Sequence, residues 1–129
     1  MSTGIVRTFY ENGKLKEEYF ELNGLKQGSY KSYHENSQLK EEVNYIDDKL
    51  NGIYKKYYGH GRLEIETNYI LGKINGIYKK YWPSGTLEIE VNYIFGKVNG
   101  ICKLYDEIGQ LKIEANYILG NLSGEIKWY

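Results

Sequence analysis

The fold is decided by residues 51–98, where NGIYKKYYGHGRLEIETNYILGKI (51–74) is followed by NGIYKKYWPSGTLEIEVNYIFGKV (75–98). Seventeen of the 24 positions hold the same residue in both segments. Self-similarity at a fixed period is typical of repeat proteins, in which one small supersecondary unit stacks on the next. The sequence therefore predicts a one-dimensional array of equivalent units.

The spacing of 24 residues extends from this segment over the rest of the chain. It is marked by a glycine column, Gly4, Gly28, Gly52, Gly76, Gly100 and Gly124. A basic column holds Arg7, Lys31, Lys55, Lys79, Lys103 and Lys127, and an acidic column holds Glu18, Glu42, Glu66, Glu90 and Glu114. We expect one repeat domain over residues 1–129, with units 4–27, 28–51, 52–75, 76–99 and 100–123 and a half unit 124–129.

Each unit has the pattern of a β-hairpin. A run rich in Tyr and Ile, such as GIYKKYY (52–58), is followed by a polar break with glycine and then by an alternating run, LEIETNYI (63–70). Two such runs parted by a glycine-bearing break predict a hairpin, and their Gly, Tyr, Ile and Val content disfavours a helix. We predict an all-β fold, an elongated antiparallel β-meander of tandem 24-residue hairpins that form one twisted, curled sheet.

The loop of each hairpin sets an expected register. If residues 11–13 form a type I turn closed by a left-handed glycine, Tyr10 faces Lys14 and pairing proceeds outward from there. The pairs expected from this register are Lys56 with Glu64, Lys80 with Glu88, Arg7 with Glu17 and Lys31 with Glu41. Lysine then never faces lysine, as expected because like charges across a ladder destabilise it.

Alternation along the strands sorts the side chains into two faces. In the third unit we expect a largely apolar face with Ile53, Lys55, Tyr57, Leu63, Ile65, Thr67 and Tyr69. We expect the opposite, solvated face to carry Tyr54, Lys56, Tyr58, Arg62, Glu64, Glu66 and Asn68. Between units, a tight turn at 71–72 and a one-residue bulge at 75–76 are expected to place Thr67 opposite Ile77 and Ile65 opposite Lys79.

The composition argues against several classes of function. Lys plus Arg and Asp plus Glu number 17 each, so no net field steers the chain toward nucleic acid. No segment approaches the ~18 apolar residues of a membrane span, and the first residues lack the basic and apolar regions of a signal peptide. We expect a soluble, cytoplasmic protein whose composition disfavours membrane binding, with an exported form left open if a leader was removed.

Residues with catalytic chemistry are sparse. His34 and His60 lie in different loops without metal-ligand spacing, and Cys102 has no histidine in its own unit or in the units beside it. The repeated glutamates make a solvated column, whereas acid–base catalysis needs two carboxylates in different environments. We therefore expect no catalytic, cofactor or metal site and no enzyme activity.

The motif of the units resembles a known repeat family. The pattern G-x-Y-K-x-Y-x-x-x-G-x-L, followed by E-x-N-Y-x-x-G-K-x-N-G, is similar to the MORN-variant repeat of bacterial proteins often described as YwqK-family antitoxins. This resemblance covers residues 4–129 and implies a β-hairpin array with an antitoxin or immunity role, exerted by binding a toxin protein. The chain lacks the H-G-x-G half of the related eukaryotic repeat, so the resemblance does not extend to membrane attachment.

One set of aromatic and basic residues forms the candidate partner-binding patch: Tyr54, Lys56, Tyr58, Tyr78, Lys80 and Trp82. On the expected solvated face these rings have no core to join, and Tyr, Trp and cationic neighbours are frequent in interface hot spots. The other tyrosine columns are expected to pack between neighbouring units.

Three classes of non-enzymatic function remain open. The favoured class is a protein-binding module, an antitoxin or immunity protein whose sheet covers a protein partner such as a toxin. The alternatives are an aromatic-lined array for glycan or cell-wall ligands and a self-assembling or membrane-associated scaffold. Homo-oligomers would use the open sheet edges or the apolar face, because both expose groups that favour association.

Overall fold

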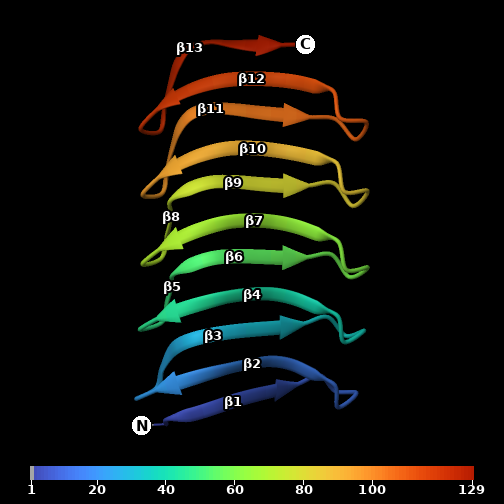
Figure 1. Cartoon of the computed structure of the whole chain (residues 1–129), viewed down its shortest axis with the longest axis vertical. Coiled ribbons are helices and arrows are strands. Elements are labelled where there is room, and N and C mark those ends of the chain that lie inside the picture. The colour runs from blue at the N-terminus through green and yellow to red at the C-terminus, as the bar shows by residue number, and fades with distance from the viewer. Residues whose placement is uncertain (1) are drawn as a thin grey trace.

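The computed structural model describes residues 2–129, which form one antiparallel β-sheet. Its strands are β1 (Gly4–Phe9), β2 (Leu15–Leu22), β3 (Leu25–Tyr33), β4 (Leu39–Ile46), β5 (Lys49–Leu50), β6 (Gly52–Tyr57), β7 (Leu63–Ile70), β8 (Lys73–Ile74), β9 (Gly76–Tyr81), β10 (Leu87–Ile94), β11 (Lys97–Tyr105), β12 (Leu111–Ile118) and β13 (Asn121–Trp128). Figure 1 shows the strands lying across the long axis of the molecule, with the two termini at opposite ends.

The order of the strands in the sheet follows the chain: β1-β2-β3-β4-β6-β7-β9-β10-β11-β12-β13. The two-residue strands β5 and β8 pair with β4 and β7 and lead directly into β6 and β9. Each hairpin therefore pairs with the next one, and no connection crosses the sheet. The predicted all-β meander of tandem hairpins is confirmed.

Two kinds of connection alternate: one kind joins the strands along one long side of the molecule, and the other kind joins them along the opposite side (Figure 1). In the three-residue loops, the Tyr10 amide donates to the Lys14 carbonyl over 2.9 Å and Gly13 has a φ of 85°, as predicted. In the tight turns both residues have positive φ, 45° at Leu71 and 89° at Gly72. This combination defines a type I′ turn, whose twist matches that of the flanking strands.

The register within the hairpins differs from the predicted one. Lys55 pairs with Glu66 and Lys56 pairs with Ile65, but Tyr57 already pairs with Leu63. Glu64 is therefore an extra residue, a β-bulge at which β7 has one residue more than β6. The predicted pairs Lys56–Glu64, Lys80–Glu88, Arg7–Glu17 and Lys31–Glu41 are wrong; the structure pairs Lys56 with Ile65, Lys80 with Ile89, Arg7 with Glu18 and Lys31 with Glu42.

The register between units contains two extra residues instead of the predicted one. Tyr69 pairs with Ile74 beside the tight turn, whereas Glu66 pairs with Lys79 farther along the same strands. The Asn75 amide still donates to the Asn68 carbonyl over 2.9 Å, so the extra residues come after Asn75. Gly76 has the positive φ expected at such a bulge, 117°. The predicted pairs Thr67–Ile77 and Ile65–Lys79 are therefore wrong.

The shifts exchange the predicted faces of β6. Tyr54 pairs with Thr67, so both side chains lie on one face, and Ile53 pairs with Asn68 on the other. We call the first face the aromatic face; its central column is Val6, Tyr19, Tyr30, Val43, Tyr54, Thr67, Tyr78, Val91, Cys102, Ala115 and Ile126. We call the second the charge face; its central column is Arg7, Glu18, Lys31, Glu42, Lys55, Glu66, Lys79, Glu90, Lys103, Glu114 and Lys127.

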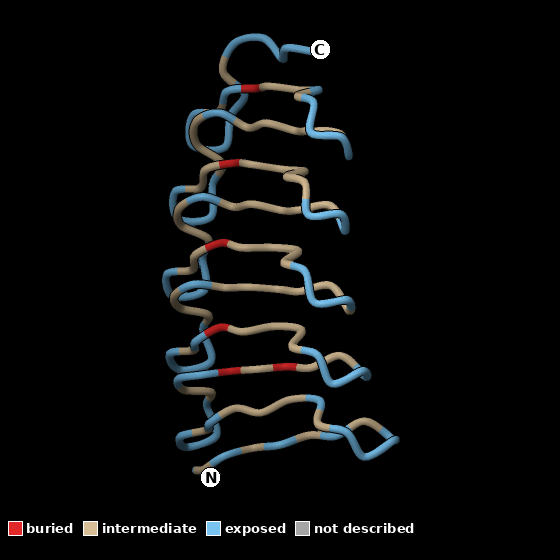
Figure 2. Tube along the Cα trace, turned by 45° about the vertical axis from the view of Figure 1, so that its right-hand side comes forward, coloured by how far each residue is buried: buried red, intermediate tan, exposed pale blue. Residues whose placement is uncertain are grey.

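The best-buried residues lie on the aromatic face, and most of them form a line along it (Figure 2). They are Tyr30, Ser32, Val43, Thr67, Val91 and Ala115. Each is shielded by side chains of the neighbouring strands, because within residues 2–129 no second layer lies over the sheet. Five of the six lie in the central column, and Ser32 lies two residues along β3 from Tyr30, beside Glu17 and Glu41. The core is thus little more than one column, and the larger rings beside it remain partly open to solvent.

Candidate binding face

The aromatic face is built from large and small residues that alternate from strand to strand. Tyr30 pairs with Val43 and Tyr78 pairs with Val91, so each ring lies beside a side chain that leaves room for it. Three ring pairs recur between residues 15 positions apart, with centroid distances of 5.5 Å for Tyr30–Tyr45, 5.7 Å for Tyr54–Tyr69 and 6.2 Å for Tyr78–Tyr93. All three are edge-to-face, a favourable geometry for aromatic rings.

In the first units, glutamate carboxylates accept hydrogen bonds from tyrosine hydroxyls of the aromatic face. The hydroxyl of Tyr30 donates to Glu17 and that of Tyr54 donates to Glu41, each over 2.6 Å. Burial, and then these carboxylates, raise the pKa of both tyrosines. The same bond from Tyr30 is the main cause that lowers the pKa of Glu17.

A lysine occupies the aromatic face at its N-terminal end. The ammonium of Lys26 lies 5.0 Å from the ring centroid of Tyr19, 5.4 Å from that of Tyr30 and 5.3 Å from that of Tyr45. Such distances permit cation–π attraction with all three rings. This end of the face therefore carries its own cation, whereas Leu50, Ile74 and Val98 take the equivalent positions in later units.

The candidate patch lies on the aromatic face and not on a separate solvated face. Tyr54 and Tyr78 have the ring partners described above, so the inference that their rings have no packing partner is wrong. The reason is the bulge at Glu64, which reverses the alternation on which the prediction rested. Lys80 Nζ lies 3.8 Å from Oε1 of Glu88, the bulge residue of β10. Whether the patch binds a partner stays a prediction.

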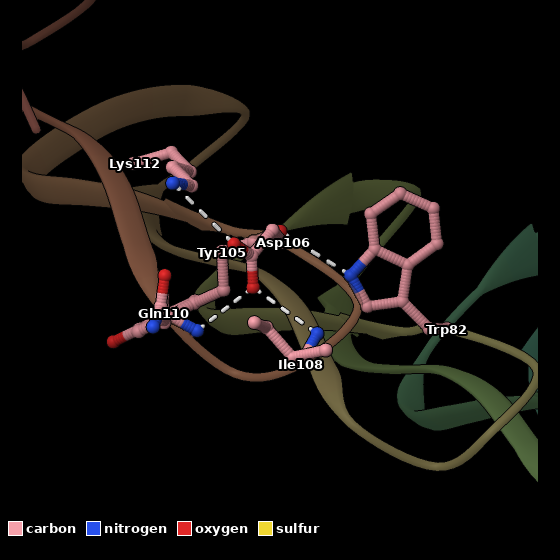
Figure 3. Close-up of polar contacts among 6 residues, drawn as sticks. All are labelled: Trp82, Tyr105, Asp106, Ile108, Gln110 and Lys112. Carbon is pink, nitrogen blue, oxygen red and sulfur yellow. Dashed lines mark hydrogen bonds and ion pairs between the residues drawn. The ribbon is translucent and has the colours of Figure 1, made fainter.

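Tyr58 and Trp82 brace neighbouring loops. The Tyr58 hydroxyl donates to the Tyr81 carbonyl over 2.5 Å. The Trp82 indole N–H donates to the Tyr105 carbonyl over 3.2 Å, as Figure 3 shows. Equivalent contacts join Tyr10 to Tyr33 over 2.6 Å and His34 to Tyr57 over 2.8 Å. Sequence reasoning missed this role, although a ring with a polar atom recurs at each of these four positions.

Asp106 is the exception in this series. Its Oδ1 accepts from the amides of Ile108, over 3.1 Å, and Gln110, over 2.9 Å, so the side chain closes its own loop (Figure 3). Lys112 Nζ lies 3.5 Å from the other carboxylate oxygen. The backbone donors, led by Gln110, lower the pKa of Asp106.

The charge face carries an uninterrupted series of opposite charges. Arg7 Nε lies 2.7 Å from Glu18 Oε2, and Lys55 Nζ lies 3.8 Å from Glu66 Oε2. Every acidic residue of the central column lies between two basic ones. Because neighbouring charges cancel, this face has little field with which to attract a charged partner.

The residues that sequence analysis considered for catalysis remain apart. Burial raises the pKa of the Cys102 thiol, and His34 contacts a backbone carbonyl. Within residues 2–129 no group of three or more His, Cys, Asp and Glu side chains is arranged to hold a metal ion. The same residues contain no helix that is long and apolar enough to cross a membrane.

Comparison with known proteins places the chain in a family. Among curated proteins no match was found. The family model described as the MORN repeat variant matches residues 2–20, 26–47, 50–70, 74–94 and 98–118. Each match contains most or all of one hairpin, and together they cover more than half of the chain. The chain therefore belongs to the MORN repeat variant family.

Proposed function

We propose that this chain is a non-enzymatic protein-binding module of the antitoxin or immunity type, and that it binds its partner, a toxin, on the aromatic face. The observation that carries the proposal is the continuous row of half-buried tyrosines that no other part of the described chain covers. Tyrosine offers a large contact area at little entropic cost, which suits protein interfaces. Membership of a repeat family also supports the proposal that the chain is a binding module.

The aromatic face is a better docking surface than the charge face. A partner that covered the charge face would remove paired charges from water, and this desolvation is costly unless new bonds replace it. On the aromatic face the partner would cover rings, with Lys56 and Lys80 beside them as directional contacts. We propose Tyr54, Lys56, Tyr58, Tyr78, Lys80 and Trp82 as the binding residues.

Adjacent lysines on opposite faces give a matched test. One variant carries Lys56→Ala and Lys80→Ala on the aromatic face, and its control carries Lys55→Ala and Lys79→Ala on the charge face. Both lose two charges from the same strands. Pull-down from the native cell with mass spectrometry identifies the partner, and calorimetry with the purified partner measures its affinity.

We expect the wild type and the charge-face variant to bind one protein that the aromatic-face variant binds at least tenfold more weakly. Equal affinity of the two variants, or selective loss with the charge-face variant, would contradict the proposed surface. For the antitoxin role, expression of the partner alone should stop growth and co-expression of this chain should restore it. A harmless partner would reject the antitoxin role but leave a binding module.

A further inference from the structure

One position in the central column of the aromatic face lacks the tyrosine ring that the preceding units have there. Cys102 occupies the position that Tyr30, Tyr54 and Tyr78 hold in the preceding units. It pairs with Val91 on one side and with Ala115 on the other. Two small side chains, Cys102 and Ala115, thus follow each other where the preceding units pair a tyrosine with valine or threonine.

The missing ring leaves a hollow in the sheet surface. Its volume is about 490 Å³, and Tyr78, Tyr93, Tyr117, Val91, Val98 and Cys102 contribute to its lining. None of the lining residues is charged. The hollow is therefore a wide-open, uncharged and mainly apolar depression with three tyrosines in its lining.

The neighbouring units show what fits such a site. The ring of Tyr54 packs edge-on against Tyr69, 15 residues later, and that of Tyr78 packs in the same way against Tyr93. Tyr117 lies 15 residues after Cys102, and within residues 2–129 it has no ring partner. Apolar space left by a smaller side chain can take an apolar ligand of matching shape.

A neutral ring suits the hollow better than a cation. At the other end of the same face, Lys26 lies over three tyrosine rings, but the carboxylate of Glu17 is near enough to act on that cation. Ile89 takes the position of Glu17 beside the hollow. A cation there would lose water without a carboxylate to replace it.

We propose that the Cys102 hollow binds one aromatic side chain, a phenyl or phenol ring, presented by a protein partner. The ring occupies the place of the absent tyrosine and packs edge-on against Tyr117. The source of the ring rests on the proposed protein-binding function. The affinity of the hollow for a ring is a property of this chain alone and can be measured without the partner.

The test uses p-cresol, which is the side chain of tyrosine as a free molecule. We expect titration of the ¹⁵N-labelled wild type to shift the amide signals of Val91, Cys102 and Tyr117 in a saturable way, with a dissociation constant on the order of 1 mM. Cys102→Tyr supplies an internal ring and should abolish these shifts. Cys102→Ala keeps the hollow and should retain them.

A swap moves the site within the chain. Tyr78→Cys combined with Cys102→Tyr should transfer the shifts by one unit, to Thr67 and Tyr93, because each position then has the residue of the other. Circular dichroism and thermal unfolding show whether each variant is folded. Cys102→Tyr restores the residue of the neighbouring units, so we expect it to fold at least as stably as the wild type.

Three results would overturn the inference: no saturable shifts in the wild type, the same shifts in folded Cys102→Tyr, or shifts with tetramethylammonium and none with p-cresol. The proposed function fails differently, through the pull-down and calorimetry of the lysine variants. If the chain binds a protein partner but not p-cresol, the proposed function stands and the hollow is not part of the interface. If the chain binds p-cresol but no protein partner, the hollow is a ring-binding site, and the proposal that a protein supplies the ring is rejected.

Discussion

At the residue scale, the tight turns place bulky side chains in a left-handed backbone conformation. Leu71, Phe95 and Leu119 have φ values of 45°, 42° and 45°, which favour glycine or asparagine. A left-handed residue with a Cβ costs about 1 kcal/mol or more. Because Leu71 as a whole residue is 53% exposed, little packing offsets this strain.

We predict that Leu71→Asn stabilises the protein by about 0.5 kcal/mol, because asparagine tolerates the left-handed region better than leucine. The free energy of unfolding, measured with denaturant, checks this. Leu71→Ala is the control, since alanine keeps the Cβ and should bring no gain. A stabilisation by alanine equal to that by asparagine would show that the effect comes from exposed apolar surface and not from φ.

The loop braces give a second prediction. Tyr58→Phe removes only the hydroxyl that donates to the Tyr81 carbonyl, and it should destabilise the protein by about 1 kcal/mol. Tyr57→Phe is the matched control, because none of the described hydrogen bonds uses the Tyr57 hydroxyl. Chemical denaturation of both variants tests the difference. Equal effects at the two positions would mean that the brace contributes nothing specific.

The bond between Tyr30 and Glu17 predicts a pH dependence. The folded state lowers the pKa of Glu17 from its ordinary 4.5, so the unfolded chain binds the proton more readily. This contribution to stability is therefore complete above the unfolded pKa and is lost as the pH falls through the lower folded pKa. Tyr30→Phe removes the main cause of the shift. Thermal unfolding between neutral and acidic pH should fall less steeply for Tyr30→Phe, and parallel curves would contradict the assignment.

At the scale of the element, the sequence specifies the hairpins more clearly than their register. Glycines mark the loops because they supply positive φ, and Ser37, which replaces one of them, still has a φ of 71°. The bulge has no such marker. Its residue is Lys16, Lys40, Glu64, Glu88 and Lys112 in successive units, so neither charge nor size identifies it. A one-residue shift in register moves every side chain of a strand to the opposite face of the sheet, and this is why the faces of β6 were predicted wrongly.

Another pattern in the sequence does predict the correct pairing of residues between strands. The basic and acidic columns keep their charge in every unit, with Lys55, Lys79 and Lys103 in one and Glu66 and Glu90 in the other. If the two columns of constant charge are required to be cross-strand neighbours, Lys55 must face Glu66, as it does. The prediction instead counted pairs outward from the loop, and the bulge lies just beyond the loop. The placement of the candidate patch failed for the same reason.

The charge column allows a test of its own. Lys79→Glu would place three glutamates in adjacent rungs, because residue 79 pairs with both Glu66 and Glu90. Like charges across a ladder repel, so we expect a loss of about 1–2 kcal/mol that shrinks at high salt. Lys79→Gln removes attraction without adding repulsion and should lose less. Unfolding at low and high ionic strength checks this; a loss independent of salt would exclude charge as the cause.

At the scale of the whole molecule, each unit contacts mainly its two neighbours. A hairpin pairs with the hairpin before it and the one after it, and its loop braces reach only the next loop. Stability in such an array is close to a sum of unit and interface terms. The length of the aromatic face can therefore change without altering the geometry of any single unit.

This property predicts which deletions the chain tolerates. Removal of residues 76–99 joins Asn75 to Gly100, which restores the Asn-Gly bulge and the alternation of charge along the sheet. We expect a folded, less stable protein with one hairpin fewer. Removal of residues 87–98 instead takes out β10, the turn after it and the first two residues of β11. The rest of β11 then follows β9, both strands carry a residue of the basic column, and like charges repel. Circular dichroism, gel filtration and ¹⁵N spectra compare the two, and unfolding of the 24-residue deletion would show that the units depend on contacts beyond their neighbours.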